Sequence, residues 1–271
     1  MIPAPFTYLR VGSVQEALDA LAEYGDDAKL LAGGHSLIPL MKYRLATPKV
    51  LIDISGIAEL SGVTFEGDSL VIGAATRHAI VEHSPVVKEH CRLLAYTASL
   101  VGDPQVRNRG TIGGSVAHGD SASDLPVSLL AMDAQFTAQG RNGTRTIAAA
   151  DFFVGFWQTA LTPNEVLINI KVPLAKQRWS YQKFTIRSQD WATVSSAVYG
   201  NAVALGAMAD IPIRARDVES ALLQGADISQ AALLADHNTS PSSDTRASSD
   251  YRRHLARVLT EDGLREALAR N

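Results

Sequence analysis

The chain has 271 residues, of which 46% are hydrophobic and 20% charged, as expected for an ordinary globular protein with two domains or one large one. Its net charge of −3 and few aromatic residues argue against nucleic acid as a principal partner, because binding a phosphate backbone needs a concentrated basic surface. No apolar stretch reaches the roughly eighteen residues of a membrane span, and Met1–Phe6 lacks the features of a signal peptide, so we expect a cytoplasmic protein without a membrane span.

Up to about residue 57, the pattern predicts strands that alternate with helices. Ser13 and Glu16 form a capping box at the start of one helix, and Gly25 ends that helix. The nearly continuous apolar run at 50–54 is typical of a strand covered on both faces. The expected strands are 6–8, 29–32 and 50–54, and the expected helices are 14–24 and 37–45.

From residue 58 to about 175, the sequence predicts two hairpins and several short helices. Asn142 and Gly143 are typical residues of a tight hairpin turn, and Pro173 stops the closing strand. The expected strands are 62–65, 70–74, 135–138, 145–147 and 166–172, and the expected helices are 77–81, 85–89, 93–101 and 125–132.

The remaining residues, from about 176, begin with strands and close with a helix. The composition of residues 238–250, rich in Ser, Thr, Asp and Pro, predicts a mobile surface loop. The expected strands are 181–187 and 195–204, and the expected helices are 217–223 and 251–269.

The number and spacing of cysteine and histidine residues do not predict a metal site in this chain. Cys91 is the only cysteine, so the chain can form neither an internal disulfide nor a cysteine-ligated iron–sulfur cluster or zinc site. We expect Cys91 to be a buried structural thiol in an amphipathic helix at 86–94. His78, His83 and His90 do not share one helical face at ligand spacing, so we expect them to be structural. Any redox chemistry therefore needs a bound cofactor.

Two glycine-rich segments are the strongest functional signal. Ala32–Ser36 follows a buried strand, and Thr111–Ser115 follows the basic turn Arg107–Gly110. Each joins a Gly-Gly pair to hydroxyl side chains, so backbone N–H groups can approach a phosphate unobstructed by a Cβ. One segment alone could be a tight turn without a ligand. Two together predict a long diphosphate ligand held from both sides, and FAD is the natural candidate.

Four runs, in order along the chain, resemble one family. They are Leu31–Lys42, Arg107–Ser115, Ser123–Pro126 and Lys183–Ala192. The first three resemble the FAD-binding medium subunit of molybdenum hydroxylases, the xanthine dehydrogenase and carbon monoxide dehydrogenase family, and the fourth resembles the start of its C-terminal flavoprotein domain.

The resemblance implies an α+β protein. A two-subdomain FAD-binding fold of the PCMH/vanillyl-alcohol-oxidase type would occupy 1–175, with subdomains at about 1–57 and 58–175. A C-terminal α/β flavoprotein domain would occupy 176–271 and cover the flavin side.

The resemblance also implies a redox complex of the molybdopterin-dependent dehydrogenase type. A small iron–sulfur subunit and a large molybdopterin subunit would accompany this chain, as a dimer of heterotrimers. Electrons would reach FAD from the iron–sulfur centres and leave for NAD, a quinone or another acceptor. No G-x-G-x-x-G fingerprint is present, so NAD would meet the flavin in a surface cleft.

Matching the family's motifs position by position implies a set of cofactor contacts. Lys183 would lie near the flavin pyrimidine edge, Trp191 against the isoalloxazine, and His35 would be a hydrogen-bonding contact. The sequence predicts no catalytic residue and no metal ligand in this chain. The implied FAD contacts are Ala32, Gly33, Gly34, His35, Ser36, Val101, Thr111, Gly113, Gly114, Ser115, His118, Asp124, Leu167, Lys183 and Trp191.

Plainer interpretations exist for several of these residues. His118 could be a structural histidine, Asp124 a helix cap and Lys183 an exposed strand residue, while Val101 and Leu167 could be core residues. Two other functional classes also compete. One is a self-contained flavin oxidase or reductase, either of the covalent type with FAD attached at His35 or resembling the peptidoglycan-precursor reductase, and the other is a noncatalytic scaffold that has lost FAD.

Overall fold

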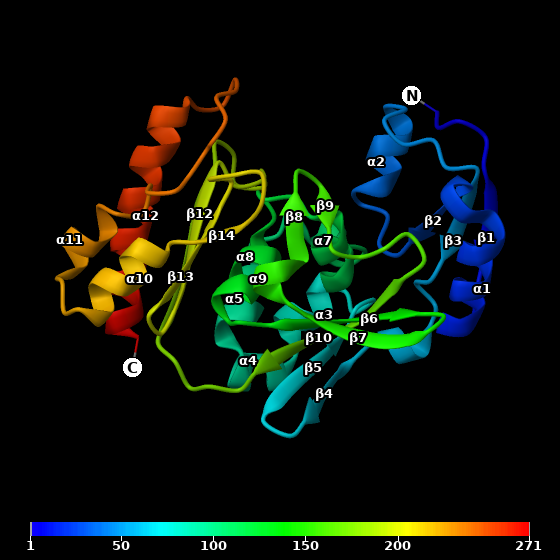
Figure 1. The fold of residues 1–271 in the computed structure, drawn as a ribbon, viewed down its shortest axis with the longest axis horizontal. Coiled ribbons are helices and arrows are strands. Elements are labelled where there is room, and N and C mark those ends of the chain that lie inside the picture. The colour runs from blue at the N-terminus through cyan, green and yellow to red at the C-terminus, as the bar shows by residue number, and fades with distance from the viewer. Residues whose placement is uncertain (1, 271) are drawn as a thin grey trace.

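The computed structural model describes residues 2–270. Three main sheets follow one another along the chain, and helices pack against each of them. Figure 1 shows these parts in a row, from the blue N-terminal sheet through the central cyan and green sheet to the yellow and red C-terminal part. No helix within 2–270 is long and apolar enough to cross a membrane.

The N-terminal sheet is parallel, with the strand order β1-β3-β2. Its middle strand, β3, is buried at every residue, as its apolar sequence predicts. Ser13 caps α1 by accepting a hydrogen bond from the Glu16 N–H, and Gly25 ends the helix at φ +51°. The elements are β1 (Thr7–Arg10), α1 (Val14–Tyr24), η1 (Gly25–Asp27), β2 (Ala28–Leu31), α2 (Leu37–Lys42), β3 (Val50–Asp53) and η2 (Ala58–Leu60).

The central sheet is antiparallel, with the order β4-β5-β10-β6-β7. Both predicted hairpins are present, although the turn of the second is centred on Arg141 and Asn142, and Gly143 already opens β7. The strands are β4 (Val63–Glu66), β5 (Ser69–Gly73), β6 (Gln135–Gly140), β7 (Gly143–Ala148), β10 (Val166–Pro173) and the separate pair β8 (Phe153–Gly155) and β9 (Gln158–Thr159).

Seven short helices lie on and beside the central sheet and enclose the largest apolar core of the described chain. All eight residues of α8 are buried, because it packs between the neighbouring helices of the central part and the C-terminal sheet. The helices are α3 (His78–His83), α4 (Pro85–His90), α5 (Arg92–Ser99), α6 (Pro104–Arg107), α7 (Ile112–His118), α8 (Asp124–Ala131) and α9 (Ala149–Phe152).

The predicted helix at 86–94 is wrong as one continuous element. Cys91 separates α4 from α5, and its φ of −136° and ψ of 56° are not helical. The thiol itself is buried, as predicted, and burial raises the pKa of Cys91 to about 12. Cys91 is therefore an inert packing residue at neutral pH.

The C-terminal sheet is antiparallel, with the order β11-β12-β13-β14, and α12 packs against β11 and β12. The single strand predicted at 195–204 is wrong, because Gly200 turns the chain at φ +59° and folds this run into a hairpin. The elements are β11 (Trp179–Phe184), β12 (Val194–Tyr199), β13 (Ala202–Gly206), β14 (Ile213–Arg214), α10 (Arg216–Leu223), α11 (Ile228–Ala232) and α12 (Ser249–Ala269).

The polar run at 238–250 is irregular up to the start of α12, as predicted, but it is tied to that helix. The Arg252 guanidinium donates to Asp244 at 2.9 Å. Arg253 donates to the Thr239 hydroxyl at 2.9 Å and to the Thr239 carbonyl oxygen at 3.0 Å. These bonds hold the loop more firmly than its composition predicts.

Candidate functional site

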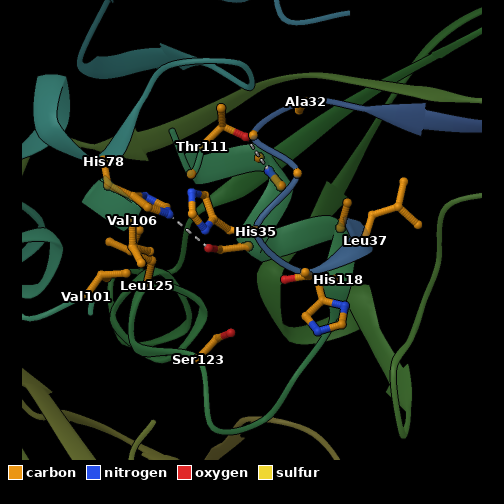
Figure 2. Close-up of a pocket in the computed structure, with 18 of the residues that line it drawn as sticks. Ala32, His35, Leu37, His78, Val101, Val106, Thr111, His118, Ser123 and Leu125 are labelled. Atoms are coloured by element: carbon orange, nitrogen blue, oxygen red, sulfur yellow. Dashed lines mark hydrogen bonds between the residues drawn. The ribbon is translucent and has the colours of Figure 1, made fainter. Parts of the chain in front are cut away.

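A cavity of about 570 Å³ opens where the three sheets meet. Its volume lies in the usual range of small-molecule and cofactor sites. Every residue that the sequence predicts as a cofactor contact lines this one cavity, although the residues come from segments as far apart as Ala32 and Trp191. Figure 2 shows Ala32, His35, Thr111 and His118 among the side chains around it.

The first glycine-rich segment presents free backbone donors. Among the described residues, no acceptor faces the amide N–H groups of Gly33, Gly34, His35 and Ser36. Gly34 has a φ of +78°, a conformation that favours glycine. Consecutive unpaired amides around such a residue form a concave site for an anion. The segment therefore has the geometry of an anion site, and its role as an FAD contact stays a prediction.

The first segment touches the basic turn that leads into the second segment. A Cβ on Gly33 would lie 2.7 Å from the Gly110 Cα and closer still to the carbonyl oxygen of Arg109. Only glycine allows this approach, because the obstacle is backbone that cannot rotate away. The close contact places both segments on the same side of the cavity.

The second segment differs from the prediction, because it is the first turn of helix α7 and the four amides after Thr111 are already hydrogen-bonded. Thr111 is the N-cap, and its Oγ1 accepts from the Gly114 N–H at 3.1 Å. The Gly113 N–H donates to the Ala74 carbonyl oxygen at 2.8 Å, and the Ser115 N–H to the Thr111 carbonyl oxygen at 3.0 Å. The hydroxyl groups of Thr111 and Ser115 are therefore the side-chain donors that this segment offers to a ligand.

A buried ion pair lies at the junction with the C-terminal sheet. Lys183 Nζ donates to Asp124 Oδ2 at 2.8 Å and to the Leu100 carbonyl oxygen at 3.2 Å. The Tyr181 hydroxyl donates to the other carboxylate oxygen of Asp124 at 2.8 Å. Lys183 and Asp124 both line the cavity, whereas Tyr181 lies behind them.

This pair replaces the plainer interpretations of both residues. The Lys183 side chain is only 8% exposed, so it is not a surface strand residue. Asp124 is the first residue of α8, and its carboxylate bonds to Tyr181 and Lys183 instead of capping the helix, whose N-cap is Ser123. Burial raises the pKa of Asp124, and Lys183 and Tyr181 oppose that rise.

His78 lines the cavity and was not predicted as a site residue. It is buried, its Nε2 lies 3.3 Å from Ser115 Oγ, and Figure 2 draws it near His35. Burial, then the charges of His35 and Arg107, lower the pKa of His78 to about 4. The spacing of histidines along the chain does not indicate that His78 belongs to the site, because its neighbours in the cavity come from other segments.

Aromatic side chains form the outer rim. The His118 ring lies 5.4 Å from the Trp157 ring and 6.4 Å from the Trp191 ring, between centroids. Trp157 is in the turn between β8 and β9 at φ +53°, where it stacks on Phe156 and donates to Asp120 Oδ2 at 3.1 Å. Trp157 was not predicted, although the Phe156-Trp157 pair stands out in a chain with 6% aromatic residues.

The lining fits a dinucleotide that carries a diphosphate and a flat ring. The free amides of the first segment and the hydroxyls of the second suit phosphate oxygens. Leu125, Leu167 and Val101 offer apolar wall, and the rim offers aromatic faces. Within 2–270, no three His, Cys, Asp or Glu side chains gather as a metal site needs.

Comparisons with known proteins agree with this arrangement. A family model described as "FAD binding domain in molybdopterin dehydrogenase" matches residues 4–175, and one described as "CO dehydrogenase flavoprotein C-terminal domain" matches 179–267. The carbon monoxide dehydrogenase medium chain of Hydrogenophaga pseudoflava is 42% identical over 285 residues, which cover 100% of this chain and 99% of that one.

Two further matches extend the comparison. Subunit alpha of the 6-hydroxypseudooxynicotine dehydrogenase complex of Paenarthrobacter nicotinovorans is 34% identical, over 100% of this chain and 97% of its own. The structure of carbon monoxide dehydrogenase from Hydrogenophaga pseudoflava lacking the Mo-pyranopterin moiety superposes with a TM-score of 0.97 at 43% identity, over 100% of this chain and 99% of that chain.

Proposed function

Because the chain belongs to the family of FAD-binding medium subunits of molybdopterin dehydrogenases, we propose that it transfers electrons from iron–sulfur centres of a partner subunit to NAD, a quinone or another acceptor. The chain is a subunit of an oxidoreductase, and FAD, when bound, supplies the electron-carrying chemistry. The single observation that carries the proposal is the cavity on which all the family-matched residues converge.

The residues of this chain would divide the work of holding FAD. The free amides of Gly33, Gly34, His35 and Ser36 would bind diphosphate oxygens, and the hydroxyls of the second segment, on the same side of the cavity, would bind others. The apolar walls and the aromatic rim would exclude water from the ring. Trp191 would cover one face of the ring, with His118 between it and Trp157.

Lys183 would donate a hydrogen bond to the polar edge of the flavin. Its ammonium group has three protons, and two acceptors are present among residues 2–270, Asp124 and the Leu100 carbonyl oxygen. The Asp124 carboxylate balances most of its charge, so we assign Lys183 mainly a directional role. Electrostatic stabilisation of the reduced flavin by Lys183 would be a smaller effect than this hydrogen bond.

The proposal includes the rest of the complex. A small iron–sulfur subunit and a large molybdopterin subunit would assemble with this chain as a dimer of heterotrimers in the cytoplasm, and relatives named as medium chains and complex subunits support this. The exposed Val154, Phe156 and Trp157 beside the cavity give a partner an apolar surface. Purification from the native host should recover two companion chains, one with iron–sulfur clusters and one with molybdopterin; recovery of this chain alone and fully active would contradict the proposal.

The division of the chain is also part of the proposal. FAD-binding subdomains would occupy about 1–57 and 58–175, and the C-terminal domain 176–271. The segment 174–178, between β10 and β11, would be the boundary of the C-terminal domain. Limited proteolysis should cleave there first; first cleavage inside β10 or β11 would contradict the division.

FAD binding is the direct test. Titrating the purified chain with FAD should quench flavin fluorescence and saturate at one FAD per chain. Gly33→Ala should bind FAD more weakly, because it disturbs the contact between the first segment and the turn before the second, and Gly12→Ala is the matched control. A wild-type chain that stays colourless after FAD is added would support a scaffold that has lost its cofactor.

A self-contained flavin oxidase or reductase with FAD attached at His35 is the second candidate. The His35 side chain lines the cavity and is exposed, so a covalent bond there is sterically open. Acid precipitation of the yellow protein separates the two cases. Colour that leaves with the supernatant supports noncovalent binding, and colour retained in the pellet supports attachment.

A further inference from the structure

His78 lies directly behind the second glycine-rich segment. It is the first residue of α3, and its backbone N–H donates to the Gly110 carbonyl oxygen at 2.9 Å. Its ring packs on the same residue, because a Cβ on Gly110 would lie 2.8 Å from the His78 Cδ2 and 2.9 Å from its Nε2. The imidazole therefore has little freedom to turn or move away.

The two ring nitrogens are in different surroundings. Nε2 lies 3.3 Å from Ser115 Oγ. Nδ1 is buried and has no hydrogen-bond partner among residues 2–270. A buried N–H without an acceptor costs more than a buried nitrogen lone pair without a donor. The proton of the neutral ring therefore belongs on Nε2.

This tautomer decides what Ser115 can do. With the proton on Nε2, the ring donates to Ser115 Oγ, and the single O–H of the serine stays free to donate elsewhere. With the proton on Nδ1, the serine would have to donate its O–H to Nε2, and nothing would remain for a ligand. Ser115 lines the cavity and its amide is already bonded to Thr111, so its hydroxyl is the only donor that it can offer.

We propose that His78 is a positioning residue, which donates from Nε2 to Ser115 Oγ and thereby directs the Ser115 hydroxyl proton to a diphosphate oxygen of FAD. The inference rests on the proposed function, and it assigns a role to a side chain that the cofactor need not touch. The lowered pKa of His78 agrees with a neutral ring that carries one N–H.

Variants at position 78 distinguish hydrogen-bond donation by the His78 ring from its packing. Gln at position 78 can place an amide N–H near the position of Nε2, whereas Asn places it near Nδ1, and Leu has no donor. We expect His78→Leu and His78→Asn to weaken FAD binding by about three- to tenfold, and His78→Gln to stay within about twofold of wild type. Ser115→Ala should weaken binding by about tenfold, because a hydrogen bond to a charged oxygen is lost.

The decisive measurement is a double-variant cycle on FAD affinity. In the Ser115→Ala background, His78→Leu should change FAD affinity by less than about twofold, because the group through which it acts is gone. The ³¹P resonances of bound FAD give an independent readout, since they report the diphosphate. One resonance should shift in His78→Leu and Ser115→Ala and stay near its wild-type position in His78→Gln.

Several outcomes would overturn the inference. Equal losses in His78→Gln and His78→Leu would mean that the ring acts by packing, and an undiminished effect in the Ser115→Ala background would mean that it does not act through Ser115. If His78→Leu fails to fold, the Asn and Gln variants carry the same comparison. A wild-type chain that binds no FAD would overturn the proposed function as well, whereas tight FAD binding with an additive cycle would overturn this inference alone.

Discussion

Gly33 shows at a single residue how the cavity depends on close contact of backbones. The nearest atoms to a Cβ at this position are backbone atoms of Arg109 and Gly110, which cannot swing aside as a side chain can. Gly12, outside the cavity, has only the flexible Glu16 carboxylate within reach of a Cβ, at 3.7 Å. A Cβ would therefore meet fixed backbone at position 33 and only a flexible side chain at position 12.

Gly33→Ala should separate the two glycine-rich segments and weaken FAD binding by at least about tenfold, because the diphosphate donors move apart. We also expect the free energy of unfolding to fall by about 1–3 kcal/mol from overpacking. Gly12→Ala should leave FAD affinity unchanged. Fluorescence titration and urea unfolding measure both effects, and equal behaviour of the two variants would refute this account of Gly33.

The His78 ring makes stability depend on pH. Its pKa is lowered to about 4 in the folded chain, while the ordinary value of 6.5 applies to the unfolded chain. Between those values the unfolded chain binds a proton that the folded chain does not, so the free energy of unfolding falls as the pH is lowered from 6.5 to 4, by up to about 3 kcal/mol. Above pH 6.5 this contribution is constant.

His78→Gln removes that titration. The difference in the free energy of unfolding between the FAD-free wild type and this variant should therefore change across the same pH window, while other titrating groups cancel. Urea unfolding at several pH values between 4 and 7.5 measures it. Parallel curves for the two proteins would show that His78 is protonated equally in the folded and unfolded chains.

At the scale of elements, α7 turns a glycine-rich sequence into a helix start. Thr111 satisfies the Gly114 N–H, and Gly113 lets the first turn lie on Ala74, just after β5, where a Cβ would come within 2.6 Å of the Ala74 carbonyl oxygen. The helix then presents Ser115 to the cavity. The segment works as a packed helix terminus, whereas the first segment works as an open loop of amides.

Thr111→Ala should lower the free energy of unfolding by about 1 kcal/mol, because the N-cap is lost. Thr111→Ser keeps the hydroxyl and should stay close to wild type. FAD binding should weaken in the alanine variant, since Thr111 is also a proposed ligand donor. Thermal unfolding with and without FAD measures both, and equal stability of the two variants would contradict the capping role.

At the scale of the whole molecule, Asp124 and Lys183 join the central part to the C-terminal sheet. Asp124 belongs to α8 and Lys183 to β11, and both side chains are buried. A buried carboxylate without its cation is strongly destabilising. The same pair forms part of the cavity wall, so one contact contributes both to the docking of the C-terminal sheet and to the shape of the site.

Lys183→Met should lower the free energy of unfolding by about 3–5 kcal/mol, because it leaves the buried carboxylate unpaired. Adding Asp124→Asn should recover part of that loss, since the neutral amide can still accept from Tyr181. Urea unfolding of the single and double variants measures the recovery. Additive losses would show that the two charges do not depend on each other.

Most of the elements were predictable from local pattern. The Ser13 cap, the Gly25 helix end and the apolar run of β3 act on neighbours in the chain, so their outcome can be inferred from a few residues. The errors lie at two breaks inside runs whose pattern looks continuous. Cys91 breaks a helical pattern, and Gly200 folds back a run that resembles one long strand.

The sequence by itself determined the family, most of the elements and a set of cofactor contacts that all line the cavity, because glycine pairs, hydroxyls and caps are local requirements of the backbone. Only the tertiary structure decided which amides stay free, that Lys183 is buried against Asp124, and that His78 reaches Ser115. The physical reason is that hydrogen-bond partners and burial depend on segments brought together by folding, and the spacing of residues along the chain carries no record of those distances.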